Sequence, residues 1–223
     1  MRPALILAAT LAATVASNAL ATPTAGAFAR LSKAAASSPL AGALRPLGAE
    51  TERVPSTARR LVWIGKDIDG DGAADFVNPT GQAPRTFDAY GSGAFGASRD
   101  SGARSHEGVD YAAVAGQAVV APMSGFVTKI GYAYGDAPAL QYVEISNPAL
   151  GYTARIFYLD PKVAVGQAVA LGDEIGQAES LQARYPGGMT DHVHLEVADQ
   201  RGHQDATDLI VARYLPIGAA ASS

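Results

Sequence analysis

The sequence predicts an all-β protein, an antiparallel sandwich or barrel, and three observations support this expectation. Apolar residues from Leu61 onward gather in short runs that contain many β-branched and aromatic members. Glycine, proline and asparagine separate these runs, as they do where turns join short strands. Beyond the N-terminus, no segment shows a helical spacing of apolar residues. Many short strands in succession are typical of sandwiches and barrels.

The expected strands follow one another through the body of the chain. The first spans residues 61–64, and the next two, 117–120 and 126–130, flank a turn at 122–125. The later ones are expected at 142–145, at 154–158, around the apolar positions Val163, Val165, Val169 and Ile175, and at 192–197. Antiparallel pairing is the simplest way to join strands so close in sequence.

A weak repeat gives a competing interpretation of this region. The letters Gly-Gln-Ala-Val at 116–119 recur at 166–169, a spacing at which repeat architectures are found, although chance explains the match equally well. The pattern is similar to lipoyl and biotinyl carrier domains, which display a modifiable lysine on a hairpin turn. The turn at 123–125 reads Met-Ser-Gly and has no such lysine.

Composition removes several classes of function. The chain has 223 residues, of which 48% are hydrophobic and 17% charged, as expected for one globular domain with additional segments. It carries 17 basic and 21 acidic residues, so it lacks the basic excess typical of nucleic-acid binding. The absence of cysteine excludes disulfides, thiolate zinc sites and a lipoprotein anchor. Imidazole chemistry must come from four residues, His106, His192, His194 and His203.

The two ends of the chain predict an exported protein. Met1-Arg2-Pro3, an apolar run at 4–16 and an Ala-Leu-Ala site at 19–21 form the pattern of a signal peptide, 1–21. We therefore expect release into the periplasm or the external medium, with no stable membrane anchor after cleavage. An Ala/Ser/Pro-rich linker or pro-segment is expected at 22–60, a β-rich lead-in at 61–100, a main domain at 101–215 and a frayed tail at 216–223.

Two histidine motifs indicate a metal site. His106 and Asp110 are four residues apart, with Gly108 between them in what reads as a loop running into a strand. His192, His194 and Glu196 alternate with apolar residues, so they project from one face of a strand. Catalytic zinc takes three nitrogen or oxygen ligands and keeps one position open. Either motif alone would suit ordinary histidines, but together they supply three ligands and a spare base.

The order of these motifs resembles the lysostaphin-type zinc metalloendopeptidases, which cut peptidoglycan peptides. His-x-x-x-Asp and His-x-His enclose Gly-Val-Asp-Tyr-Ala-Ala and Ala-Pro-Met-Ser-Gly-Phe-Val, and the likeness covers residues 93–197. It implies a small antiparallel fold of the duplicated hybrid motif type, with a groove, and makes 101–215 the metallopeptidase-like domain. It also implies that Zn²⁺ is bound by His106, Asp110 and His194, and that His192 is the catalytic histidine beside the metal.

One position departs from this family. A second catalytic histidine usually lies in a Tyr-x-His-Leu stretch, whereas this chain has Tyr158 in Ile-Phe-Tyr-Leu at 156–159. A phenol, with an ordinary pKa of about 10, is a poor base but can donate a hydrogen bond to a developing oxyanion. Tyr158 is thus either a catalytic group or simply an aromatic residue of a strand. The sequences at 155–158, 184–187 and 192–194 are similar to those of the leukocyte-derived chemotaxin branch of this family. Members of that branch keep the zinc site and act by binding.

These observations lead to one expected function and two alternatives. The expected one is an exported zinc endopeptidase in which a zinc-bound water attacks an amide of a peptidoglycan peptide, with His192 relaying the proton and Tyr158 holding the oxyanion. Glu196 and Glu107 are candidates to orient a ligand, although each is equally plausible as a solvated glutamate. The alternatives are a weakened member that binds cell-wall peptide or regulates another hydrolase, and an exported zinc peptidase that acts on proteins.

Two further motifs lie in the lead-in. Asp67, Asp69, Asp71 and Asp75, with a glycine at the sixth position, match the start of a calcium loop, so we expect a structural Ca²⁺. Asn78 replaces the usual final glutamate, and an acidic surface turn is the alternative. Residues 91–96 fit the text of a nucleotide-binding glycine motif, but no helix follows, and a loop bordering the groove is expected. Arg99 and Arg104 nearby are candidates to meet substrate carboxylates.

Overall fold

The computed structural model describes residues 58–217, which form part of one compact unit. The predicted signal peptide, 1–21, lies outside the described residues, as do most of the 22–60 segment and the tail from 218 onward. Among the described residues, the all-β prediction is confirmed. Short and long strands alternate with turns, and the helical elements are the 3₁₀ turn η1 (Asp100–Gly102) and the four-residue helix α1 (Ala206–Leu209).

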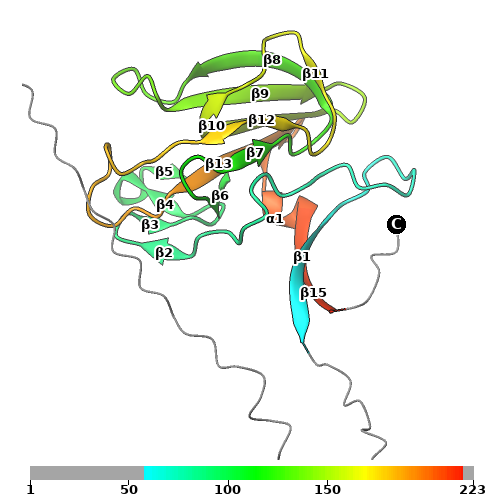
Figure 1. The fold of residues 1–223 in the computed structure, drawn as a ribbon, viewed down its shortest axis with the longest axis horizontal. Helices are drawn as coiled ribbons and strands as arrows, with labels where there is room; N and C mark the ends of the chain where they lie inside the picture. Colours follow the sequence, from blue (N-terminus) through cyan, green and yellow to red (C-terminus); the bar gives the residue numbers. More distant parts are fainter. Residues whose placement is uncertain (1–57, 218–223) are drawn as a thin grey trace, which may run out of the picture. The chain divides into compact units, whose positions relative to one another are not determined.

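A nine-stranded antiparallel sheet forms the body of the unit (Figure 1). Six strands follow in the order β11 (Ala168–Val169), β8 (Gly125–Tyr132), β9 (Gln141–Asn147), β10 (Tyr152–Pro161), β12 (Glu174–Ala178) and β7 (Ala118–Val120). The strand β13 (His192–Asp199) pairs with β10, with β6 (Val109–Ala112) and with β14 (Gly202–Gln204). Most of the expected strands are present, and several are longer than the sequence pattern indicated. Val163 and Val165 are an exception, because they lie in the turn region between β10 and β11.

The alternation of side chains along β13 separates the core from the groove. Val193, Leu195 and Val197 are fully buried in the hydrophobic cluster, where they join side chains of β9, β10 and β6. His192 and His194 lie on the opposite face of the strand, as the period of two requires. Burial of each such aliphatic side chain stabilises the fold by about 1.5–3 kcal/mol, so the register of β13 is firmly set.

The strand β10 changes partner in its middle. Residues 153–157 pair with β13, and Leu159 to Pro161 pair with β12. The pairing with β9 also shifts register between Phe157 and Leu159, which leaves Tyr158 in a β-bulge. A bulge re-aims the side chain that it carries, and bulges are common beside active sites.

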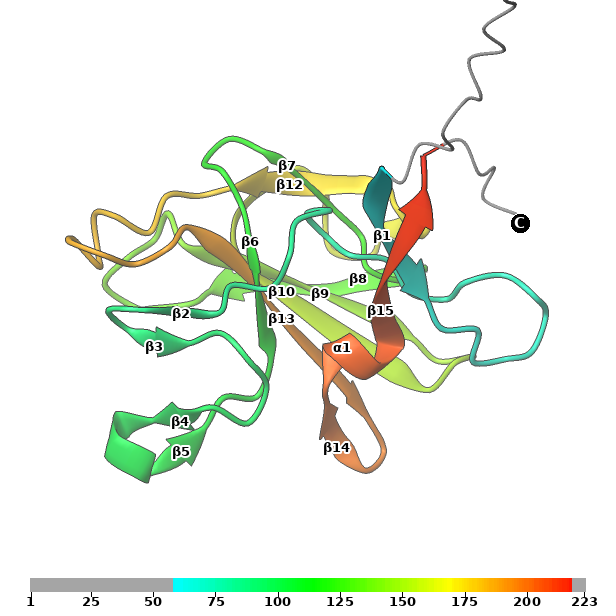
Figure 2. The ribbon, with the colours of Figure 1, turned by 90° about the horizontal axis from the view of Figure 1, so that it is seen from below.

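The lead-in and the C-terminal strand form a ribbon beside the main sheet (Figure 2). The strand β1 (Arg59–Gly65) pairs antiparallel with β15 (Ile210–Pro216), so pairing includes the last residues of the predicted linker and the first residue of the predicted tail. The ring of Trp63 lies edge-on to that of Tyr111, with centroids 6.1 Å apart. The lead-in thus belongs to the same compact unit as residues 101–215.

Two small hairpins precede β6, and both lie near it in the two views of the ribbon (Figures 1 and 2). One joins β2 (Phe87–Asp88) to β3 (Gly91–Ser92), and the other joins β4 (Ser98–Arg99) to β5 (Arg104–Ser105). Residues of both hairpin regions, including Tyr90, Arg99 and Arg104, line the groove described below. Residues 91–96 do not themselves line the groove, but the carbonyl of Ala94 contacts Nδ1 of His106, which does.

Candidate metal centre

A groove of about 370 Å³ contains both histidine motifs. His106, Asp110, His192 and His194 line it together with Glu196. Tyrosines 134, 158 and 185 supply an aromatic part of its lining. The structure thus brings all the predicted site residues, apart from those of the calcium loop, to one place.

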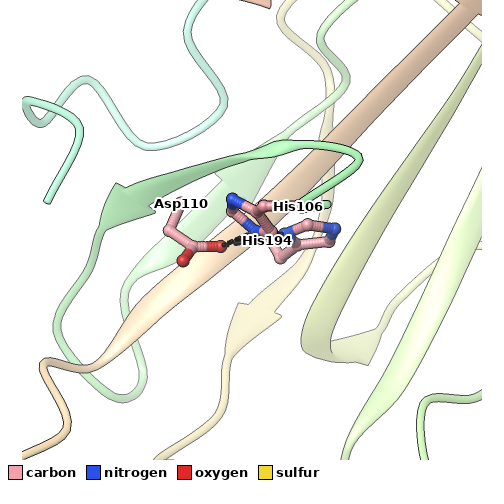
Figure 3. Close-up of side chains that lie close together, drawn as sticks. All are labelled: His106, Asp110 and His194. Carbon is pink, nitrogen blue, oxygen red and sulfur yellow. Dashed lines mark hydrogen bonds and ion pairs between the residues drawn. The ribbon is translucent and has the colours of Figure 1, made fainter. Parts of the chain in front are cut away.

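The pairing of β6 with β13 assembles the three expected metal ligands (Figure 3). It places Asp110 directly opposite His194, while His106 comes from the loop before β6. Nδ1 of His194 is 2.8 Å from Oδ1 of Asp110 and 2.9 Å from Nε2 of His106. The third side of the triangle, from His106 Nε2 to Asp110 Oδ1, measures 3.1 Å.

This triangle fits zinc. Tetrahedral zinc with bonds of about 2.0–2.1 Å places its ligand atoms about 3.3 Å apart, so a small outward movement of the three side chains would accommodate the ion. The hydrogen bonds of the outer nitrogens also suit the ion, because His106 Nδ1 bonds to the carbonyl of Ala94 (2.8 Å) and His194 Nε2 to Glu196 Oε1 (3.3 Å). With protons on those outer atoms, the lone pairs of His106 Nε2 and His194 Nδ1 would be directed at a bound zinc ion in place of the hydrogen bonds that they make to Asp110 without metal.

Burial and mutual contacts set the charges of the cluster. Although burial opposes ionisation of Asp110, hydrogen bonds from His106 and His194 hold the pKa of its carboxyl far below the ordinary value. Burial also opposes protonation of His194, but its hydrogen bonds to Asp110 and Glu196 raise its pKa to about 8. The metal-free cluster therefore holds a carboxylate and takes up a proton near neutral pH.

His192 lies beside the three ligands with one nitrogen free to accept a proton. Its Nδ1 bonds to the carbonyl of Thr190 at 2.7 Å, and its Nε2 is 3.5 Å from Oδ1 of Asp110. Burial lowers the pKa of His192 despite the nearby charge of Asp110. A neutral ring whose Nδ1 donates to Thr190 keeps a lone pair on Nε2 that faces the cluster.

Tyr158 points into the groove from a strained backbone. Its φ is +70°, a conformation that is rare for an aromatic residue and is often found at functional sites. The ring meets that of His192 edge-on, with centroids 5.4 Å apart. Burial, together with the neighbouring Tyr134, strongly raises the pKa of Tyr158, so the phenol stays protonated and can act only as a hydrogen-bond donor or acceptor.

A chain of hydroxyl groups supports Tyr158. The hydroxyl of Tyr185 donates to that of Tyr134 at 2.9 Å, and Tyr134 is 2.8 Å from the hydroxyl of Tyr158. The Arg184 guanidinium lies 4.0 Å from the centre of the Tyr134 ring and pairs with Asp136 at 2.8 Å. If each hydroxyl donates to the next, the proton of Tyr158 is left to point away from Tyr134.

The predicted orienting glutamates differ in what they touch. Glu196 contacts His194 directly and is also 3.7 Å from Nε2 of His203. Glu107 is exposed and lies 3.9 Å from Nδ1 of His203, without contact to His194. His203 therefore lies near the site, which sequence reasoning missed because only the β13–β14 pairing brings it there.

Gly108 is needed for a reason that the sequence did not reveal. We expected it to let the chain bend, but the structure shows a close approach of the backbone to β13 instead. A Cβ at this position would overlap the carbonyl oxygen of Leu195 and lie 2.7 Å from Cε1 of His194. The space that a glycine leaves lets the loop with His106 approach His194.

Sequence reasoning also missed Arg85, which lies in the lead-in and belongs to no motif. Its Nε and Nη2 atoms are each 2.9 Å from Oδ2 of Asp110. The second oxygen of the predicted metal ligand is therefore held by a buried guanidinium. No pattern in the sequence distinguishes this arginine from the others.

The acidic loop after β1 is closed by its own hydrogen bonds. Ligand atoms of Asp67, Asp69 and Asp71 come within 4.8 Å of one another. Asp75 instead accepts a hydrogen bond from the backbone N–H of Ile68 at 2.7 Å, and Asp67 accepts from the N–H groups of Gly70 and Gly72. A turn of this kind holds together without an ion, so structural calcium at Asp67, Asp69, Asp71 and Asp75 stays a prediction.

An antiparallel β-fold with a His-Asp-His cluster in a groove is the arrangement expected of a metal-dependent hydrolase. The sequence comparison agrees with this class, because the model of Peptidase family M23 matches residues 104–206. Leukocyte cell-derived chemotaxin-2 from Bos taurus is 32% identical over 116 residues, which make up 52% of this chain and 73% of the chemotaxin. The chain belongs to Peptidase family M23.

Solved structures with a similar fold include two peptidases. A zinc-containing peptidase from Vibrio cholerae is 26% identical, with a TM-score of 0.45, over 59% of this chain and 39% of the other. The catalytic domain of lysostaphin, an antimicrobial peptidase from Staphylococcus simulans, is 22% identical, with a TM-score of 0.42, over 54% of this chain and 89% of the other. Separately, none of the helices between residues 58 and 217 is long and apolar enough to cross a membrane.

Proposed function

We propose that this chain is an exported zinc-dependent endopeptidase that hydrolyses amide bonds in peptidoglycan peptides. The observation that carries the proposal is the convergence of His106 Nε2, Asp110 Oδ1 and His194 Nδ1 within 3.1 Å of one another, with His192 beside them. Membership of a peptidase family supports hydrolysis. The predicted signal peptide supports export, and the resemblance of both histidine motifs to cell-wall endopeptidases supports the substrate.

His106, Asp110 and His194 would hold the zinc. When bound there, zinc supplies a Lewis acid that makes water more acidic and polarises the amide carbonyl. His192 takes the proton of the attacking water at Nε2 and delivers it to the nitrogen of the leaving amine. Its lowered pKa fits this role, because the ring is neutral and can accept a proton at the start of the reaction.

Tyr158 donates a hydrogen bond to the oxygen that becomes negatively charged as the carbonyl is attacked. Its hydroxyl stays protonated because burial raises its pKa, and Tyr134 supports the donor from behind. A donor that is fixed before the reaction stabilises the developing charge without first having to reorganise. Arg99 and Arg104 line the same groove and would attract carboxylates of an acidic peptide.

A second function is favoured by one observation, the presence of Tyr158 where the family usually has a histidine. A chain with one catalytic histidine fewer would keep its zinc and its groove and bind cell-wall peptide, or regulate another hydrolase, without cutting. The similarity to a protein named as a chemotaxin agrees with this alternative. Hydrolysis of a protein in place of peptidoglycan is the third candidate.

One experiment separates these functions. The zinc-loaded mature protein is incubated with purified peptidoglycan, with unfolded casein and with neither, in the presence and absence of a chelator. We expect the protein to release amino groups from peptidoglycan, but not from casein, only when zinc is present. The His194→Ala variant should release none. Co-sedimentation with peptidoglycan without any release of amino groups would instead establish the binding function. Release of amino groups from casein alone would establish hydrolysis of a protein.

A further inference from the structure

The two oxygens of Asp110 have different environments. Oδ1 faces the three histidines of the groove, at 2.8 Å from His194 and 3.1 Å from His106. Oδ2 faces away and receives the Nε and Nη2 atoms of Arg85, both at 2.9 Å. Nη2 of Arg99 is farther from Oδ2, at 3.7 Å, and donates to the carbonyl of Ser92 at 2.9 Å. The guanidinium thus occupies the oxygen that a freely rotating carboxylate would also offer to a metal, and leaves Oδ1 alone for it.

Arg85 is itself held by a second carboxylate. Its Nη1 atom is 2.8 Å from Oδ2 of Asp88 and 2.9 Å from the carbonyl oxygen of Gly91. All three nitrogens of the guanidinium are therefore engaged, and the Arg85 side chain is only 5% exposed. A planar fork fixed on both sides is far more rigid than a surface arginine.

The same chain of contacts reaches the proposed general base. Oδ2 of Asp88 also accepts a hydrogen bond from the backbone N–H of Thr190 at 2.9 Å, and the carbonyl of Thr190 bonds to Nδ1 of His192 at 2.7 Å. Asp110, Arg85, Asp88, Thr190 and His192 thus form a nearly closed ring of contacts, because His192 Nε2 is 3.5 Å from Asp110 Oδ1. The ring fixes a metal ligand and the base relative to each other.

The backbone around Arg85 is shaped for this contact. The N–H of Arg85 bonds to the carbonyl of Asp110 at 2.8 Å, and the N–H of Asp110 bonds to the carbonyl of Gly93 at 2.9 Å. A Cβ at Gly93 would lie 2.5 Å from Cγ of Arg85 and 3.0 Å from Cβ of Asp110. The glycine leaves the space through which the arginine reaches the aspartate.

We propose that Arg85, held by Asp88, is a positioning residue of the metal centre that fixes Asp110 as a one-oxygen ligand. The inference rests on the proposed zinc site but not on peptidase activity. It assigns a role at the site to the lead-in, which lies outside residues 104–206 matched by the family. Groups that orient metal ligands typically change metal affinity by about 10–100-fold when removed.

The charge of Arg85 makes this inference sharply testable. A cation close to the site repels a metal ion, so removal of Arg85 would strengthen zinc binding if charge alone mattered. If positioning dominates, the same removal weakens binding, because Asp110 becomes free to rotate. Arg85→Lys keeps the charge and loses the fork, so it separates the two effects further.

The experiment measures the zinc dissociation constant by competition with a chromophoric chelator. It compares the wild type with Arg85→Met, Arg85→Lys and Asp88→Asn. Arg201→Met is the matched control, because this exposed arginine pairs with Asp199 and is not among the residues that line the groove. Thermal unfolding of each metal-free variant, followed by circular dichroism, shows whether it is folded at the temperature of the titration.

We expect Arg85→Met and Arg85→Lys to bind zinc about 10–100-fold more weakly than the wild type, with a smaller loss in Asp88→Asn and unchanged affinity in Arg201→Met. Cobalt absorption spectra should change in shape in the Arg85 variants, because the coordination by Asp110 changes. Unchanged or tighter binding in folded Arg85→Lys or Asp88→Asn would overturn the inference, even if Arg85→Met fails to fold. A wild type that binds no zinc would instead overturn the proposed function.

Discussion

Asp110 and His194 lie directly opposite each other in the β6–β13 pairing, with Oδ1 of the aspartate 2.8 Å from Nδ1 of the histidine. The hydrophobic residues that alternate with them set this register, since a shift by one residue would bury the histidines in the core. The geometry of the site is therefore a direct consequence of core packing. The ligand side chains are already close together before a metal ion binds.

Loss of a ligand should abolish zinc binding. We expect His194→Ala to show no zinc-dependent rise in melting temperature, whereas zinc at about 100 times its dissociation constant should stabilise the wild type by about 2.7 kcal/mol. Arg201→Ala is the control, because this exposed residue pairs with Asp199 and is not among the residues that line the groove. Calorimetry with and without zinc checks both. Equal shifts in wild type and His194→Ala would contradict the assignment.

Zinc affinity should depend on pH through His194. Zinc must displace the proton that His194 binds in the metal-free protein, and the pKa of that ring is raised to about 8. Affinity should therefore fall by up to about tenfold per unit as the pH is lowered from 8 to 6.5. Chelator competition across this range is the check, and an affinity that does not change with pH would argue against Nδ1 of His194 as a ligand.

The same ionisation should act in the opposite direction on the metal-free protein. Because the folded pKa lies above the ordinary value of 6.5, the contribution of His194 to stability is fully present below pH 6.5 and is lost as the pH rises through about 8. We expect urea unfolding of the metal-free wild type to show this decline, and His194→Ala to lack it. A decline of the same size in the variant would assign it to other groups.

Tyr158 should matter for the chemical step. Tyr158→Phe removes the donor and keeps the ring, so kcat should fall by about 10²-fold with little change in KM. Tyr158→His restores the residue that the family usually has. A large gain in activity in Tyr158→His would show that the tyrosine lowers the activity of the natural chain. An unchanged kcat in Tyr158→Phe would show that Tyr158 only lines the groove.

A side chain at position 108 should destabilise the protein, because the loop at Gly108 packs closely against β13. Gly108→Ala places a methyl group against the Leu195 carbonyl and the His194 ring, and overpacking of this kind costs about 1–3 kcal/mol. Gly135→Ala is the control, because no atom lies within 4 Å of a Cβ built there. Urea denaturation measures both, and zinc affinity should also fall in Gly108→Ala alone. Equal stabilities of the two variants would contradict the steric argument.

The sequence predicts most of the fold and much of the site because both depend on local patterns. Alternation along 192–197 gives the strand and the shared face of His192 and His194. The roles of Arg85 and His203 could not be predicted, since each reaches the site only through tertiary contacts between distant segments. The bulge at Tyr158 could not be predicted either, because it lies where the pairing partner of β10 changes from β13 to β12.

We propose that one zinc ion held by His106, Asp110 and His194 makes this chain a peptidoglycan endopeptidase. The most direct test follows the rate of amino-group release from purified peptidoglycan as zinc is added to the metal-free mature protein. We expect the rate of release to rise until one equivalent of zinc per chain has been added and then to stay constant, and we expect no release by His194→Ala. No release at one bound equivalent, or release that is independent of zinc, would contradict it.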